Sequence, residues 1–123
     1  MTPYYESTIL RSGEETADLL AGGVLILYAD PIPDALESVS VVHSPSGPPA
    51  AKMEPGHVLT VGDQQVRLVR VGEIANDNLA SLGHVVVYLD PGEDAALLPG
   101  AVHASGPLGV PAAGATLTLA AGS

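Results

Sequence analysis

Residues Gly23–Ala35 read GVLILYADPIPDA, and residues Gly83–Ala95 read GHVVVYLDPGEDA. The two stretches share a glycine, a tyrosine, an Asp-Pro pair and an Asp-Ala pair at the same internal spacing, 60 positions apart. In both, a run of aliphatic residues leads into turn residues, which is typical of a strand followed by a tight loop. The chain therefore contains an internal repeat built around this strand.

The repeat extends on both sides of these stretches. At the same spacing, Val42-His43 recurs as Val102-His103. Shorter matches join Arg11–Glu14 to Arg70–Glu73, Asp18–Ala21 to Asp77–Ala80, and Gly56–Thr60 to Gly114–Thr118. The repeat units cover about residues 9–62 and 68–119 of a single domain, 1–123. A unit of this size cannot bury its own apolar face, so we expect both copies to share one core. Closing their strands into a barrel with a pseudo-twofold axis would also remove exposed edges.

Short apolar segments between turn residues predict the strands. They are Ser7–Leu10, Val24–Tyr28, Val39–Val42, Val58–Val61, Val66–Val71, Val85–Leu89, Ala101–Val102 and Thr116–Leu119. Acids in the first turn or apolar residues at helical spacing predict two helices, Gly13–Ala21 and Glu73–Leu82. The length of 123 residues fits one mainly β domain with two short helices.

The charge balance excludes several classes of function. Fourteen acids face four Lys and Arg residues, for a net charge of −10. This argues against nucleic acid and against anionic membranes, because both require a basic footprint. The absence of cysteine excludes disulfides, thiolate metal sites and cysteine nucleophiles. No signal peptide or apolar run of membrane-spanning length is present, so we expect no membrane insertion and a cytoplasmic location.

The histidines are the candidate catalytic residues. His43 and His103 each lie in a segment without any charged residue, Ser38–Ala51 and Ala95–Ser123. Carboxylates would repel a phosphoryl group, so acid-free surroundings suit a histidine that accepts phosphate. The alternative is a strand-end histidine that is satisfied by hydrogen bonds. The loop expected after His43 would offer N–H groups and the hydroxyls of Ser44 and Ser46 to the phosphoryl oxygens.

The other two histidines have simpler interpretations. His84 opens a predicted strand and is expected to point inward or to lie near the rim of the barrel. His57 lies in a Pro-Gly-His turn, where we expect solvent exposure. Three histidines and a carboxylate could bind zinc or iron, but no His-x-His or His-x3-His pair is present.

Two motifs resemble a known family, the IIA component of the glucitol/sorbitol-type phosphoenolpyruvate-dependent sugar phosphotransferase system. The motifs are DNLxxLGHV at residues Asp77–Val85 and PGxVHxxGP at residues Pro99–Pro107. The early Arg11-x-Gly13 and the Pro55-Gly56 turn also fit, and the similarity continues to Thr118.

The resemblance implies a small, closed, six-stranded β-barrel. It also implies that one histidine receives a phosphoryl group from phospho-HPr and passes it to the IIB component of a sugar permease. Matched by position after the third strand, that histidine is His43, and the transfer needs no metal or other cofactor. From the repeat we expect His103 to approach His43 across the pseudo-twofold axis. His103 and His84 are therefore our candidate helper residues.

The sequence leaves two other classes of function open. The chain could be a small metal-dependent β-barrel enzyme of the cupin type, which metal analysis would detect. It could also be a non-catalytic regulatory module that kept the fold. A neighbouring gene for a membrane IIB/IIC protein would argue against the regulatory module, and its absence would favour it.

Overall fold

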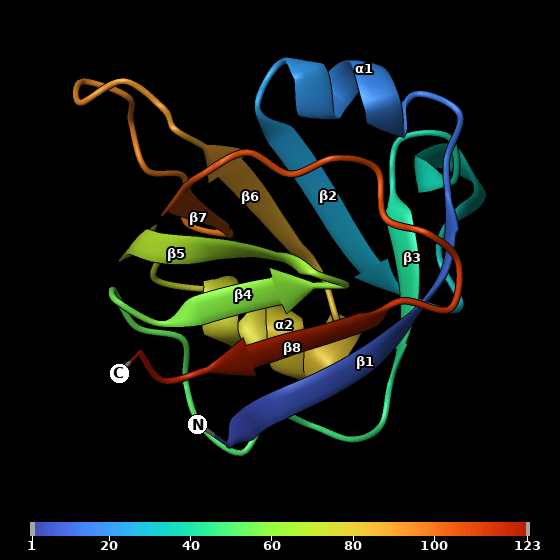
Figure 1. Ribbon diagram of the computed structural model, residues 1–123, viewed down its shortest axis with the longest axis horizontal. Coiled ribbons are helices and arrows are strands. Elements are labelled where there is room, and N and C mark those ends of the chain that lie inside the picture. Colours follow the sequence, from blue (N-terminus) through green and yellow to red (C-terminus); the bar gives the residue numbers. More distant parts are fainter. Residues whose placement is uncertain (1, 123) are drawn as a thin grey trace.

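The computed structural model describes residues 2–122 (Figure 1). Its strands are β1 (Pro3–Ser12), β2 (Val24–Ala29), β3 (Val41–Pro45), β4 (Val58–Val61), β5 (Gln64–Val71), β6 (Val85–Leu89), β7 (Ala101–Ser105) and β8 (Thr116–Ala120). Its α-helices are α1 (Thr16–Ala21) and α2 (Ala75–Leu82), and a 3-10 turn, η1, covers Asp34–Leu36. All eight segments predicted as strands contain a strand, and both predicted helices form.

The strands close into one barrel in the order β1-β3-β2-β6-β7-β5-β4-β8, with β8 returning to β1. Within the described residues, only β2–β3 and β6–β7 are parallel pairs, and the other neighbours are antiparallel. The expectation of six strands was wrong, because the barrel formed by residues 2–122 has eight. The short strands β4 and β8 pair with each other and complete the circle.

The barrel has the pseudo-twofold topology that the repeat predicts. Exchanging β1–β4 for β5–β8 maps the strand order onto itself. Local irregularities repeat as well: β1 shifts register between Ile9 and Arg11 against β3, and β5 shifts between Leu68 and Arg70 against β7. Such bulges increase the local twist of a strand, here at equivalent places in both copies.

The two copies differ in one respect that matters for the site. Tyr28 of β2 pairs with Val42, whereas the equivalent Tyr88 of β6 pairs with His103. The connection between β6 and β7 is thus one residue longer than that between β2 and β3. The spatial counterpart of His103 is Val42, and the counterpart of His43 is Ala104. The expectation that the two histidines are equivalent was therefore wrong, although both follow a valine.

Both copies contribute to one apolar core inside the barrel. Val41 of β3 and Val102 and Ala104 of β7 belong to it, as do Leu20 of α1 and Leu79 of α2. Since strand residues alternate between faces, His43 shares the inner face with Val41, and His103 lies on the outer face. Neither α-helix in the described part of the chain is long and apolar enough to cross a membrane.

Candidate functional site

His43 is enclosed by the barrel. It lies in β3 with Ile9 of β1 on one side and Ala29 of β2 on the other. Its exposed fraction is 0%, and the cavity beside it measures only about 10 Å³. A space of this size is at the lower limit for a single water molecule, so any larger group could reach the ring only after a local rearrangement.

Two hydrogen bonds fix the ring of His43. The Nε2 atom lies 2.7 Å from the carbonyl oxygen of Gly83, and Nδ1 lies 2.7 Å from the hydroxyl of Ser7. A carbonyl oxygen can only accept, so Nε2 carries the proton and donates it. Nδ1 therefore holds the lone pair and accepts from the Ser7 hydroxyl. This pairing satisfies both ring nitrogens in the neutral form.

Burial also keeps His43 uncharged. Desolvation lowers the pKa of His43 below its usual value, and the hydrogen bond to Gly83 opposes this shift to a smaller extent. A neutral imidazole is the nucleophilic form, and the lowered pKa preserves it at neutral pH.

The carbonyl that covers His43 belongs to a tightly packed turn. Gly83 ends α2 in the left-handed conformation, with φ of 60°. A Cβ atom at this position would come within 2.4 Å of the Cβ of Ala29, so only glycine fits. Its neighbour Leu82 is 45% exposed. The peptide group that closes the site therefore lies one residue from the surface.

Tyr5 is a second polar group at this site. It lines the same small cavity as His43, and the two rings are edge to face with centroids 6.4 Å apart. Its hydroxyl is buried without a hydrogen-bond partner among the described residues. Desolvation raises the pKa of Tyr5 to about 12, so the hydroxyl keeps its proton and remains a donor.

Ser44 and Ser46 do not lie beside the imidazole. The predicted loop after His43 is instead the continuation of β3 to Pro45, so successive side chains alternate between faces. Ser44 is exposed, and the Ser46 hydroxyl donates to the carbonyl of Glu6. The hydroxyl that contacts His43 is that of Ser7. The one signal in the sequence that could have identified Ser7 is its polar side chain at an inward-facing position of β1.

The remaining predicted residues make no hydrogen bond with the imidazole of His43 among residues 2–122. His84 is half-buried, its Nδ1 donates to the carbonyl of Leu27, and its ring packs on Tyr28. His57 is half-buried rather than exposed, because the Tyr4 hydroxyl bonds its Nδ1 atom at 2.9 Å. Among residues 2–122, no group of three or more His, Asp or Glu is arranged to hold a metal ion.

His103 and His43 do not face each other. Strands β2 and β6 lie between β3 and β7, which puts three strand spacings, about 14 Å, between their backbones. The side chains also point to opposite faces of the barrel wall. The two imidazoles therefore cannot share one phosphoryl group.

Fold and site together define a class of protein: a closed β-barrel of two pseudosymmetric copies that encloses one neutral histidine. A family model described as the glucitol/sorbitol-specific IIA component of the PTS system matches residues 4–118. The chain belongs to this family, as its motifs indicated.

Similar proteins agree with this assignment. The glucitol/sorbitol-specific EIIA components of Shigella flexneri and Escherichia coli are each 35% identical over 108 residues, which cover 88% of this chain and 86% of theirs. The crystal structure of a PTS system IIA component from Enterococcus faecalis has a TM-score of 0.81 at 22% identity. That alignment covers 91% of this chain and 96% of the other, and it supports the barrel fold.

Proposed function

We propose that His43 accepts a phosphoryl group from phospho-HPr and passes it to the IIB component of a glucitol/sorbitol-type permease in the cytoplasm. Membership of the family makes the chain a phosphoryl carrier of a sugar phosphotransferase system. The observation that supports His43 is its neutral imidazole, which is held at one nitrogen by Ser7 and covered at the other by Gly83.

The transfer can be written without net uptake or release of a proton. The Nε2 lone pair of His43 attacks phosphorus in line as the P–N bond to the donor histidine breaks. The donor ring carries a proton on its other nitrogen and leaves as a neutral imidazole. For the attack, the ring proton of His43 moves from Nε2 to Nδ1, where it is donated to the Ser7 hydroxyl. Because a hydroxyl can both donate and accept, Ser7 supports the ring before and after the transfer. Ser7 is thus a positioning residue for His43.

Access to Nε2 requires the Gly83 peptide to move away. When it does, the phosphoryl oxygens enter the space beside Tyr5, whose unpaired hydroxyl can donate to them. This contact replaces the one that we predicted for Ser44 and Ser46. His84 follows Gly83 directly and moves with it, so it remains a candidate helper, whereas His103 does not.

The surface beside Gly83 suits the donor protein. A pocket of about 500 Å³ is lined there by Tyr28, Pro31, Ile32, Pro33 and Leu82, together with Ala29, Asp30 and Ser81. Ala29 pairs with His43 and packs against Gly83. A carrier that docks in this pocket would therefore contact the residues that pack against Gly83, whose carbonyl covers Nε2 of His43. The acid at its edge, Asp30, would steer a donor with basic groups around its phosphohistidine.

The test is phosphorylation of the purified chain by phosphoenolpyruvate, enzyme I and HPr, followed by intact-mass measurement. We expect one acid-labile, base-stable phosphoryl group on the wild type and none on His43→Gln. The matched controls are His57→Gln, His84→Gln and His103→Gln, which should each still accept one group.

Two results of the labelling experiment would contradict the proposal. Undiminished labelling of His43→Gln would contradict the assignment of the acceptor. A folded wild type that takes no phosphoryl group would favour the non-catalytic regulatory module instead.

A further inference from the structure

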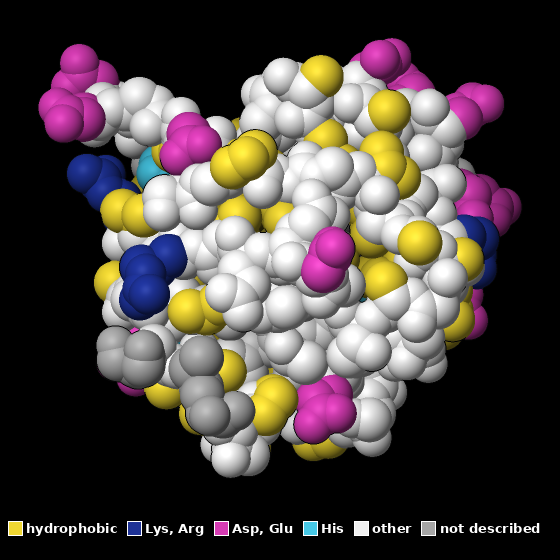
Figure 2. All heavy atoms as spheres, viewed as in Figure 1, with side chains coloured by type: hydrophobic (Ala, Val, Ile, Leu, Met, Phe, Trp, Pro, Cys, Tyr) yellow, Lys and Arg dark blue, Asp and Glu magenta, His cyan; other side chains and the backbone are white. Residues whose placement is uncertain are grey.

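The outer wall of the barrel carries a second pocket on the strands that hold His103. It measures about 450 Å³ and is lined by residues of β5, β7 and the loop that follows β6. The polar residues in its lining are Arg70, Asp90, Glu93, His103 and Ser105. Figure 2 shows histidine colour at the surface beneath the protruding loop between β6 and β7, next to basic and acidic side chains. This volume is in the range of small-molecule sites.

Hydrogen-bond donors converge in this pocket through the strand register. Arg70 lies directly opposite His103 in the β5–β7 pair, and Ser105 lies two residues along the same face of β7. His103 is 4% exposed, yet no described residue forms a hydrogen bond with its ring. Arg70 likewise forms no ion pair within residues 2–122. A guanidinium, an imidazole and a hydroxyl are therefore available to a ligand.

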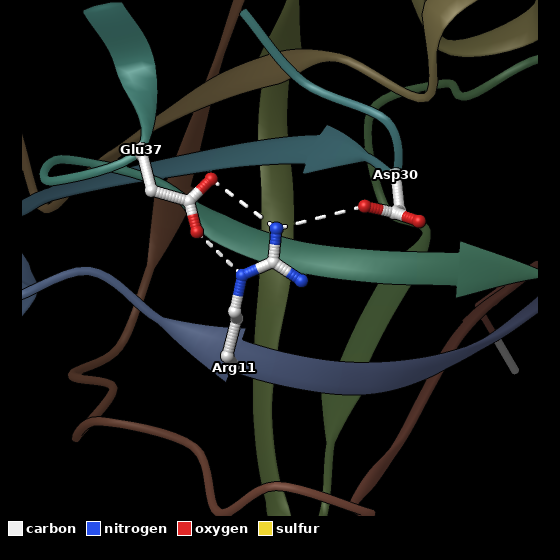
Figure 3. Close-up of polar contacts among 3 residues, drawn as sticks. All are labelled: Arg11, Asp30 and Glu37. Carbon is white, nitrogen blue, oxygen red and sulfur yellow. Dashed lines mark hydrogen bonds and ion pairs between the residues drawn. The ribbon is translucent and has the colours of Figure 1, made fainter. Parts of the chain in front are cut away.

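The arginine at the equivalent position of the first copy, Arg11, has the carboxylate partners that Arg70 lacks among the described residues. There Arg11 holds Glu37 through two nitrogens and contacts Asp30 at 3.6 Å (Figure 3). Asp90 is the counterpart of Asp30, but Leu98 stands where Glu37 would be. The equivalent glycines Gly13 and Gly72 identify these counterparts, because each packs closely against the backbone of the segment in question. A Cβ on Gly13 would meet the carbonyls of residues 37 and 38, and a Cβ on Gly72 would meet those of residues 98 and 99. Residue 98 therefore corresponds to residue 37.

In the first copy, the carboxylate of Glu37 therefore binds the guanidinium of Arg11. In the second copy, no carboxylate among residues 2–122 occupies the corresponding position at Arg70. The second copy also carries His103 where the first has Val42. The Arg11 site shows that an arginine in this setting accommodates a second anion beside the aspartate. An anionic group of a ligand can accordingly take the place of Glu37 at Arg70.

We propose that this pocket binds a phosphomonoester that also carries hydroxyl groups, in the size class of a phosphorylated hexitol. Arg70, His103 and Ser105 hold the phosphate oxygens, since charge-assisted and bidentate bonds favour oxyanions. The carboxylates of Asp90 and Glu93 would repel a bare phosphate, but they accept hydrogen bonds from hydroxyls farther along the ligand. Asp90 already accepts from the N–H of Gly106, which holds it in place.

The experiment is a titration of the full-length, isotope-labelled chain with glucitol 6-phosphate, followed by NMR of the backbone amides and histidine rings. Inorganic phosphate and glucitol are separate arms. We expect saturable shifts at residues 70, 90, 103 and 105, with weaker binding of phosphate and none of glucitol. Arg70→Gln should weaken binding at least about tenfold, as expected for loss of a charge-assisted contact.

Arg67→Gln is the matched control, because it removes the same charge from the same strand outside this pocket. It should leave the affinity within about twofold, since screened charges outside the site act weakly. Equal losses in the two variants, or no saturable shift with the wild type, would overturn the site. Equal affinity for phosphate and glucitol 6-phosphate would overturn the role of Asp90 and Glu93. No phosphoryl transfer is involved, so the outcome is independent of which histidine is the carrier.

Discussion

At the scale of single residues, the site consists of one buried polar pair and one buried unpaired donor. His43 and Ser7 satisfy each other inside an apolar barrel, and the backbone of Gly83 satisfies the remaining ring nitrogen. The Tyr5 hydroxyl has no such partner among residues 2–122. Buried polar groups without a partner are rare and often have a function in another state of the protein.

His43 predicts a pH dependence of stability. Its pKa is lowered in the folded state, so below about pH 6.5 the unfolded chain binds more protons than the folded chain. The contribution of His43 to stability is therefore present above the unfolded pKa and is lost as the pH falls. Urea unfolding between pH 5 and 7 should show wild type losing up to about 1.4 kcal/mol per pH unit more than His43→Gln. Parallel pH profiles for the two proteins would contradict a buried neutral imidazole.

The variant Tyr5→Phe tests whether the buried hydroxyl of Tyr5 takes part in phosphorylation or only fills the core. Removing a buried hydroxyl that has no partner should leave stability unchanged or raise it by about 1 kcal/mol. If the hydroxyl donates to the phosphoryl group, the same variant should accept phosphate more slowly, by about tenfold for one lost donor of 1.4 kcal/mol. Thermal unfolding and the rate of phosphorylation measure the two effects. An unchanged rate would show that Tyr5 only fills the core.

The sequence predicted some of these residues and not others. The acid-free surroundings of His43 and His103 identified both as candidates. The roles of Ser7 and Gly83 depend on contacts between residues 36 and 40 positions apart, which no local pattern shows. The prediction for Ser44 and Ser46 rests on their proximity to His43 in the chain, but adjacent residues in a strand point in opposite directions.

At the scale of elements, the strands followed from local sequence, whereas their register did not. Aliphatic segments between turn residues were sufficient to predict β4 and β6 over their full lengths. The matching Val-His pairs suggested equivalent positions in β3 and β7. The additional residue between β6 and β7 shifts one copy by a single position, and in a strand this exchanges the inner and outer faces. The extra residue is in a loop, where sequence pattern is a poor guide.

Two glycines at equivalent places should be equally sensitive to substitution. A Cβ on Gly13 would approach the carbonyl of Glu37 to 2.3 Å, and one on Gly72 would approach the carbonyl of Pro99 to 2.3 Å. Gly13→Ala and Gly72→Ala should each cost at least about 1–3 kcal/mol, because backbone must shift to relieve the overlap. Gly47→Ala, with no atom within 4 Å of the added carbon, should stay within about 0.5 kcal/mol. Denaturant unfolding of the three variants checks this, and unequal losses at Gly13 and Gly72 would count against equivalent copies.

At the scale of the whole molecule, the two copies depend on each other. In the part of the chain that the structure describes, β4 pairs only with β5 and β8, both from the second copy, and β8 pairs only with β1 and β4 of the first. Half of the eight strand pairs thus join one copy to the other. The repeat in the sequence predicted this shared barrel because neither copy could bury its apolar face alone. The count of six strands did not come from the residues, which indicated eight segments.

This dependence predicts the behaviour of fragments and tests whether the chain is one domain. Fragments 1–62 and 63–123 should each lack a cooperative unfolding transition, since separation breaks four strand pairs and leaves β4 in one fragment and β8 in the other without any partner. Mixed in equal amounts, they should regain the strand signal in circular dichroism and a cooperative transition. A monomeric fragment 1–62 that unfolds cooperatively by itself would show that the copies are separate folding units.

The most direct test of the proposed carrier is NMR of the chain labelled with 15N in its histidine rings and phosphorylated through HPr. We predict a single ring with 31P–15N coupling at Nε2 and a protonated Nδ1, which is the arrangement that Ser7 can support. The amides around Gly83 should shift, and the ring of His103 should not. This coupled resonance should be missing from His43→Gln. Coupling on another ring, or on Nδ1 of His43, would contradict the transfer geometry described for this barrel.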